Sequence, residues 1–195
     1  MDIDPASLDR RAAYQLMISC IIPRPIAWVT TLSKEGVVNL APFSYFNGVS
    51  SFPPIVSIAV GSRRDGRKDT WINVEETGEF VVNIVTKETA DAMVLTSKEL
   101  PHNVSEMELA KLESEPSLKV KPPRVKASPV HLECVRYKIV EVESSALILG
   151  RVVHYHVRDS VATNGLVDPA KVSVVGRLGG DAYALVDGMF DLKRP

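Results

Sequence analysis

The chain has 195 residues, of which 45% are hydrophobic and 24% are charged, and its formal net charge at pH 7 is −1. A chain of this length can bury a sizeable core, and this composition excludes a disordered protein. Because 23 basic residues are balanced by 24 acidic ones, the chain lacks the cationic excess of a general nucleic-acid binder. Any cationic site must therefore be local.

Cysteine content and the N-terminal segment bear on where the protein works. The two cysteines, Cys20 and Cys134, lie far apart and match no metal-ligand spacing. One long-range disulfide stays open, although two buried thiols in a reducing compartment fit better. The N-terminal MDIDPASLDRR is acidic and polar, unlike a signal peptide, and no apolar run approaches the roughly 20 residues that cross a bilayer. We therefore expect a cytoplasmic protein.

The first third of the chain predicts a helix followed by three strands. Residues 7–20 have helical spacing, with Ser7 as the N-cap. The β-prone runs 26–32 and 37–41 are joined by Ser-Lys-Glu-Gly, which favours a hairpin. A third strand is expected at 55–60, and the two prolines before it mark its edge.

The middle of the chain predicts a helix, a strand and a second helix. The first helix covers residues 69–77, with Asp69 or Thr70 as its N-cap and a glycine at its end. Residues 80–85 (FVVNIV) form the strand, and residues 86–95 form the second helix.

Between residues 96 and 129 the character of the chain changes. Five prolines punctuate a polar stretch that can hold at most one short helix, for which Ser105 and Glu108 would form a capping box. The stretch has too little apolar material for a second domain, so we predict a single domain over residues 1–195, with 96–129 as a Pro-rich excursion. Long ordered excursions often cover a site or a partner subunit.

Two long strands are expected next, at residues 130–142 and 146–157, with a short last strand at 172–175. The apolar positions of the first long strand shift phase by one residue, which predicts a β-bulge. Hairpins and a bulged strand favour a mainly β (α+β) antiparallel barrel with short inserted helices over a doubly wound parallel sheet. The chain carries no GxGxxG or Walker motif.

The cationic stretch GSRRDGRKDT, residues 61–70, follows the third predicted strand directly. It could be an ordinary solvated turn. It could also be a phosphate site, because residues 68–70 would begin a helix, where unpaired N–H groups and the positive dipole end attract an anion. Lys68 would then supply a point charge, Thr70 a hydroxyl and Arg63 a planar fork. The residues alone leave both interpretations open.

Several segments, in this order, closely resemble the flavin reductase-like family, which includes flavoredoxins and the reductase components of two-component flavin monooxygenases. They are RPIAWVTT (24–31), NLAPFSYF (39–46), KDT (68–70), TGEFVVN (77–83) and GRLGG (176–180) with Tyr183. The resemblance covers nearly the whole chain, from about residue 14 to residue 183. It implies an FMN-binding split β-barrel that usually forms a homodimer, with each flavin near the subunit interface.

The resemblance also implies three groups of cofactor-binding residues. The flavin phosphate would be surrounded by Ser62, Arg63, Lys68, Asp69 and Thr70. The first strand would line the flavin site with Trp28, Thr30 and Thr31. The isoalloxazine edge would be followed by Asn39, Ala41, Pro42, Phe43 and Ser44. The segment NLAPFS, residues 39–44, supplies backbone N–H groups and short polar side chains, which suit the carbonyls and nitrogens of the isoalloxazine ring.

Some positions leave their roles open. His154 and His156 occupy a strand where some relatives place a histidine near the nicotinamide, but the pattern favours surface residues on an edge strand. Arg177 fits the terminal motif and equally an ordinary surface role. The pair Glu106-Met107 replaces the family's Glu-Phe, which leaves the shape of the excursion open. We assign no catalytic side chain and no metal ligand.

The sequence therefore predicts an FMN-binding oxidoreductase, with FAD possible in place of FMN. NAD(P)H would reduce the flavin, which would supply reduced flavin or electrons to a partner such as a monooxygenase. One alternative is a flavoredoxin-like carrier that holds its FMN tightly. Another is a barrel that binds a phosphorylated ligand without redox chemistry.

Overall fold

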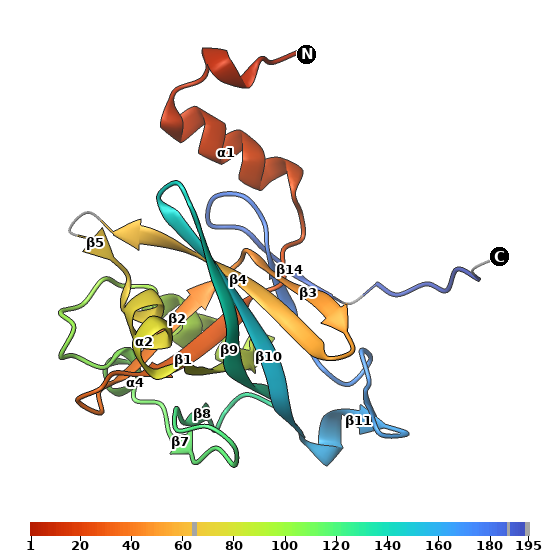
Figure 1. Cartoon of the computed structure of the whole chain (residues 1–195). Coiled ribbons are helices and arrows are strands. Elements are labelled where there is room, and N and C mark those ends of the chain that lie inside the picture. The colour runs from red at the N-terminus through yellow and green to blue at the C-terminus, as the bar shows by residue number, and fades with distance from the viewer. Residues whose placement is uncertain (64–65, 187, 194–195) are drawn as a thin grey trace.

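One antiparallel sheet of eight strands forms the centre of the protein (Figure 1). The computed structural model describes residues 1–63, 66–186 and 188–193, so Arg64 and Asp65 of the cationic stretch lie outside it. The strand order is β2-β1-β6-β9-β10-β4-β3, with β5 paired to β4. The strands are β1 Ala27–Leu32, β2 Val38–Phe43, β3 Phe46–Ser51, β4 Pro54–Arg63, β5 Gly66–Arg67, β6 Glu79–Ile84, β9 Val130–Val142 and β10 Ser145–Val157. This arrangement confirms the predicted antiparallel, mainly β fold.

Strand β1 lies in the interior of the sheet and is buried on both faces. Val29 belongs to the core inside the barrel, whereas Trp28 belongs to a second core that contains Leu40 and Met93. The β1–β2 turn ends at Gly36, whose φ of 87° suits glycine. The predicted hairpin is therefore confirmed.

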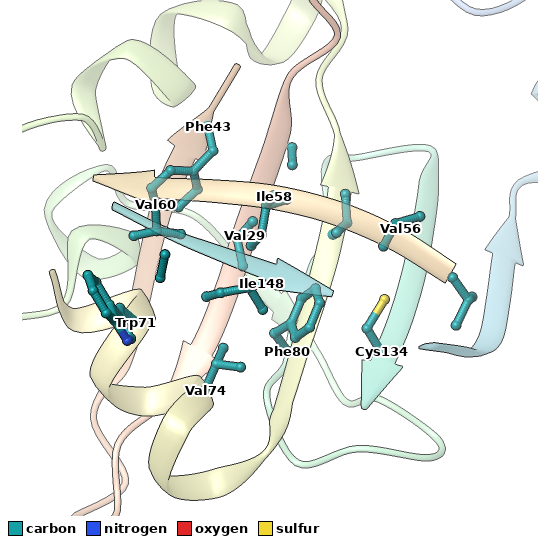
Figure 2. Packing of buried hydrophobic residues seen from close by; sticks show 14 residues of the cluster. Val29, Phe43, Val56, Ile58, Val60, Trp71, Val74, Phe80, Cys134 and Ile148 are labelled. Carbon is teal, nitrogen blue, oxygen red and sulfur yellow. The ribbon is translucent and has the colours of Figure 1, made fainter. Parts of the chain in front are cut away.

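Helix α2 (Asp69–Thr77) closes one side of the barrel core, as Figure 2 shows. Trp71 and Val74 point from the helix into the core, where they meet Phe80 and Ile148. The helix ends at Gly78 in the left-handed conformation, as predicted.

The predicted bulge is present where β9 pairs with β10. The register skips Tyr137 of β9 and also Val153 of β10. Each skipped residue breaks the alternation of side chains between the two faces. The bulge in β9 lies at Tyr137, two residues beyond Val135, where the apolar positions of the sequence shift phase. Strand β10 lies between β9 and β4, but its pairing with β4 ends at Arg151. His154 and His156 therefore lie on a part of β10 that pairs with β9 alone, as expected for an edge.

The predicted helix 86–95 and the excursion 96–129 contain short elements packed against the barrel. They are η2 Lys87–Thr89, α3 Ala90–Leu95, α4 Glu106–Leu109, β7 Ser114–Glu115 and β8 Arg124–Val125. Helix α4 begins after Ser105, but the Ser105 side chain makes no capping hydrogen bond, so the predicted capping box does not form.

Buried polar side chains of the barrel hold the backbone of the excursion. The fully buried Glu133 carboxylate accepts hydrogen bonds from the N–H groups of Leu118 (2.8 Å), Lys119 (2.6 Å) and Val120 (3.2 Å), and His156 Nε2 lies 2.5 Å from it. Burial raises the pKa of Glu133, but the hydrogen bonds from His156 and the backbone outweigh burial and hold that pKa below its usual range. The excursion is therefore anchored although it has little apolar surface.

The C-terminal part forms two short hairpins, and the second lies beside the second core. Its elements are η3 Asp159–Val161, β11 Ala162–Thr163, β12 Leu166–Val167, β13 Val175–Arg177 and β14 Tyr183–Leu185. Arg177 forms a backbone bridge with Arg24. A Cβ at Gly176 would come within 2.9 Å of Pro23 Cβ, so glycine allows this close approach. The strand predicted at 172–175 corresponds to β13, which begins three residues later, at Val175, and β14 after it was not predicted.

Helix α1 (Arg10–Cys20) stands apart from the sheet (Figure 1), after the single turn η1 (Pro5–Ser7). Only Ile18 of α1 is buried, whereas Tyr14 and Met17 are about half exposed. Asp9 caps the helix, because its carboxylate accepts the Ala12 N–H at 2.8 Å. The predicted Ser7 cap is wrong: both Ser7 and Asp9 lie near the start of α1, and the side chain of Asp9 forms the cap.

Two smaller expectations also fail. Strand β3 was not predicted, because its sequence FNGVSS is polar and, among the described strands, it pairs only with β4. Both cysteines are free thiols, but Cys20 is exposed and only Cys134 is buried.

In the part of the chain described here, no helix is long and apolar enough to cross a membrane.

Candidate functional site

A hollow lies at the N-terminal end of α2, and we call it the α2 hollow. Its wall comes from β2, the end of β4, the start of α2 and the segment that follows α3. It is lined by Asn39, Ala41, Pro42, Phe43, Arg63, Lys68, Asp69, Thr70, Thr96, Ser97, Lys98, Glu99, Leu100 and Glu106. Eight of the thirteen residues proposed from the sequence are brought together here.

The cationic end of the α2 hollow combines a helix start with an ion pair. Lys68 is the N-cap residue of α2, and no side chain among the described residues caps the helix there. Asp69 therefore is not the cap that the sequence predicted, and neither is Thr70. The Asp69 carboxylate instead lies 3.6 Å from the Arg63 guanidinium and contacts the ring of His102. Arg63 also donates to the Leu100 carbonyl at 3.4 Å, which ties the excursion to this end of the hollow.

A buried amide–hydroxyl network fixes the wall of the hollow. Asn39 Nδ2 donates to Thr70 Oγ1 at 2.9 Å and to Thr31 Oγ1 at 3.1 Å. Asn73 Nδ2 donates to the same Thr31 hydroxyl at 3.0 Å. The network joins β1, β2 and the start of α2, so the positions of Asn39 and Thr70 are set by packing rather than by a flexible loop.

Three further predicted residues lie behind the hollow or away from it. Trp28 is fully buried and its Nε1 donates to Thr96 Oγ1 at 2.9 Å. The Thr30 hydroxyl, also fully buried, accepts from Asn83 Nδ2 at 2.8 Å. Ser62 is exposed, and its hydroxyl donates to the Ser144 carbonyl at 2.7 Å. None of these side chains, nor that of Thr31, lines the α2 hollow.

A second hollow adjoins the first, and we call it the Tyr183 hollow. It shares Pro42 and Ser97 with the α2 hollow and contains Ser44, the remaining predicted residue. Its full lining is Tyr14, Ile26, Pro42, Ser44, Met93, Val94, Ser97, Arg177, Asp181 and Tyr183. The sequence did not assign Tyr14, Met93 or Tyr183 to a site, although the GRLGG segment with its tyrosine was a signal.

Two arginines organise the Tyr183 hollow. Arg24 is 3% exposed and donates to the carbonyls of Ile21 (2.7 Å) and Leu178 (2.7 Å) and to Ser44 Oγ (3.3 Å). The Arg177 guanidinium lies over the Tyr183 ring, 4.6 Å from its centroid. Arg24 thereby fixes the end of α1, the C-terminal hairpin and the end of β2 relative to one another.

Glu106 adds a buried carboxyl group to the α2 hollow. Its Oε2 accepts the Leu40 N–H at 3.0 Å, which fastens α4 to β2. Burial raises the pKa of Glu106, and hydrogen bonds from the backbone offset part of that rise. The contact holds the strand that carries Asn39 and Ala41.

The histidines of β10 lie in neither hollow. The rings of His154 and His156 are 4.6 Å apart, and His156 contacts Glu133. Within the described residues, no group of three His, Cys, Asp or Glu side chains could hold a metal ion. His156 therefore serves the anchor of the excursion, and the His154 ring packs against His156.

Comparison with known proteins gives the family. The flavin reductase like domain matches residues 18–172. An uncharacterised protein of Halalkalibacterium halodurans is 40% identical over all of this chain and 97% of its own length. The crystal structure of nitrilotriacetate monooxygenase component B from Bacillus cereus is 38% identical, with a TM-score of 0.94 and 98% of each chain covered. That of 2-nitrobenzoate 2-nitroreductase from Pseudomonas fluorescens is 32% identical, with a TM-score of 0.92, covering 100% of this chain and 96% of its own. This chain belongs to the flavin reductase-like family.

Proposed function

We propose that the protein is an NAD(P)H-dependent flavin reductase that binds FMN along the two adjoining hollows. One observation carries this proposal: the cationic start of α2 and the aromatic Tyr183 hollow meet at Pro42. A mononucleotide with a phosphate at one end and a planar ring at the other matches a cationic hollow that adjoins an aromatic one. The family supports a flavin as the ligand.

The phosphate end rests on the start of α2. The first N–H groups of a helix have no acceptor within the helix, and the dipole there favours an anion. Lys68 and Arg63 add positive charge and Thr70 adds a hydroxyl at the same end of the hollow. Each hydrogen bond to a charged group contributes about 1.5–3 kcal/mol, so a few of them can retain a phosphate monoester. Asp69 then serves to hold Arg63 rather than to face the phosphate.

The segment 97–100 favours FMN over FAD. It lines the hollow on the side of Arg63, and its Leu100 carbonyl accepts from that arginine. A second phosphate and an adenosine beyond the first phosphate would meet this segment. We therefore expect FMN to bind more tightly than FAD, which competition between the two flavins can measure.

The ring end needs orientation more than acid–base chemistry from the protein. Bound flavin supplies the redox chemistry, because it accepts a hydride from NAD(P)H and passes electrons on. Pro42, Phe43 and Ser44 would follow the edge of the ring, with backbone N–H groups and the Ser44 hydroxyl toward its carbonyls. The buried Trp28 and Thr30 side chains would act by holding β1 and its neighbours in place.

A second copy and a redox partner complete the proposal. Helix α1 exposes Tyr14, Met17 and Ile21 and packs little against its own barrel, which supports a homodimer in which this helix contacts the other subunit. One relative is named as a monooxygenase component, which supports a monooxygenase as the recipient of reduced flavin or electrons. Sedimentation measures the dimer, and cell fractionation checks the expected cytoplasmic location.

The direct test is the absorbance spectrum and released cofactor of the purified protein, followed by anaerobic mixing with NADH or NADPH. Bleaching of the flavin absorbance on mixing supports the reductase. Bound FMN that neither nucleotide reduces would favour a flavoredoxin-like carrier. A colourless protein that ignores added FMN but retains another phosphate ester would favour a non-redox binding barrel.

A matched pair of variants tests the phosphate end. Lys68→Ala should weaken FMN binding by about tenfold or more, since one charge-assisted bond is lost. Lys138→Ala, which removes an exposed lysine that lines neither hollow, should leave binding unchanged. Equal affinities of the two variants would end the phosphate assignment.

A further inference from the structure

Both arginines at the Tyr183 hollow are held by neutral groups. Arg24 donates to main-chain carbonyls and to the Ser44 hydroxyl. Arg177 donates to the Tyr183 hydroxyl and to the Gly180 carbonyl. In the described part of the chain, no carboxylate lies within 4.0 Å of either guanidinium. The positive charge of both side chains is therefore not cancelled by an ion pair.

The two arginines are neighbours because their backbones are bridged. Arg24 N–H donates to the Arg177 carbonyl at 2.9 Å, and Arg177 N–H donates to the Arg24 carbonyl at 2.8 Å. Arg177 lines the hollow, whereas Arg24 lies behind it and reaches Ser44 on its wall. Burial of Arg24 limits screening by solvent, so its charge still acts at the wall. The Asp181 side chain is the acidic group of this lining, and its residue is exposed.

A positive wall is not needed for the oxidised isoalloxazine ring, which is neutral. Two-electron reduction changes this: NAD(P)H loses a hydride and becomes NAD(P)⁺, and the ring that gains the hydride carries one negative charge unless it takes a further proton. Charge near the ring nitrogens is one of the means by which proteins tune a flavin. The wall would therefore distinguish the two redox states of the ligand.

We propose that Arg177, supported by Arg24, is the residue that stabilises the reduced flavin and so sets the reduction potential of the bound cofactor. This inference rests on the proposed function, because it requires FMN with its ring in the Tyr183 hollow. Tyr183 acts as a positioning residue, since its ring and hydroxyl hold the guanidinium against the hollow.

The test measures the midpoint potential of bound FMN and the dissociation constants of oxidised and reduced FMN. Arg177→Gln should bind reduced FMN about tenfold more weakly relative to oxidised FMN, which lowers the potential by about 30 mV for two electrons. Arg177→Lys keeps the charge and should restore most of the potential. Arg151→Gln removes an exposed arginine that lines neither hollow and should match the wild type.

The opposite charge change gives an independent test on an exposed residue, in case Arg177→Gln does not fold. Asp181→Asn removes the negative charge from the lining and should raise the potential. An unchanged potential in Arg177→Gln, an Arg177→Lys variant as low as Arg177→Gln, or an unchanged or lowered potential in Asp181→Asn would overturn the inference. A wild-type protein that binds no FMN would overturn the proposed function as well, so the two failures are distinguishable.

Discussion

Protonation of His131 should weaken the fold in mild acid. This side chain is 2% exposed, and its Nε2 donates to the Val125 carbonyl at 2.9 Å. Its Nδ1 is buried without a hydrogen-bond partner among the described residues, so a proton there would gain no acceptor. Burial lowers the pKa of His131 from its ordinary 6.5 to about 4, although the Val125 hydrogen bond opposes this. The neutral ring is therefore a requirement of the folded state.

The expected loss of stability follows from this lowered pKa. Between pH 6.5 and about 4 the unfolded chain binds a proton on His131 that the folded chain excludes, so the free energy of unfolding falls as the pH drops through this window. Each pKa unit corresponds to about 1.4 kcal/mol, so the full contribution is about 3 kcal/mol. Well above pH 6.5 the unfolded chain no longer binds this proton, so the contribution of His131 to stability is complete and no longer depends on pH.

Urea unfolding followed by tryptophan fluorescence can measure this effect, since Trp28 and Trp71 are both buried. The wild type and His131→Gln should be compared at several values from pH 7.5 to 4.5. The glutamine amide can still donate to Val125 but does not titrate, so the variant should lose less stability on acidification. Parallel pH profiles for the two proteins would refute the reasoning, because the acid sensitivity would then come from other groups.

Two further predictions concern the core and the α2 hollow. Gly150→Ala should destabilise the protein by about 1–3 kcal/mol, because a Cβ there would overlap the Phe80 ring, with Cε1 2.7 Å away. Gly61→Ala, whose Cβ would meet only Ser145 Oγ at 3.9 Å, should stay within about 1 kcal/mol of the wild type, and similar urea midpoints for both variants would contradict the packing argument. Glu106→Gln should stabilise the protein at pH 8. Because the pKa of this buried carboxyl group is raised, its protonated form stabilises the fold in acid, and this stabilisation is lost as the pH rises through the folded-state pKa. A less stable variant at pH 8 would show that the charge itself is needed there.

The sequence was informative wherever structure follows from neighbouring residues. The β1–β2 hairpin, the extent of α2 with its glycine end, and the bulge in β9 all depend on turn chemistry or side-chain period. Strand β3 was not predicted because its residues are polar and it is held to β4 by backbone pairing. Composition signals burial, and an exposed edge strand buries little.

Capping by Asp69 failed for a reason that lies outside the local sequence. An aspartate at the start of a helix normally accepts backbone N–H groups. Here the carboxylate instead contacts Arg63 and His102, which are six and 33 residues away in the chain. Contacts of this kind depend on how the excursion folds over the barrel, and its polar, proline-rich sequence does not specify that path.

The three residues of β1 assigned to the flavin site show what strand geometry alone could have decided. Successive side chains of a strand point to opposite faces, so Thr30 and Thr31 could not both face one cavity. Thr31 joins the network of Asn39 and Thr70 at the α2 hollow, whereas Thr30 and the Trp28 carbonyl bind Asn83 on the other face. A motif such as RPIAWVTT can therefore mark a binding site without lining it. In this protein its two faces fix the strand between the core and the wall that carries Asn39, and the proposed ligand would meet side chains of the wall itself.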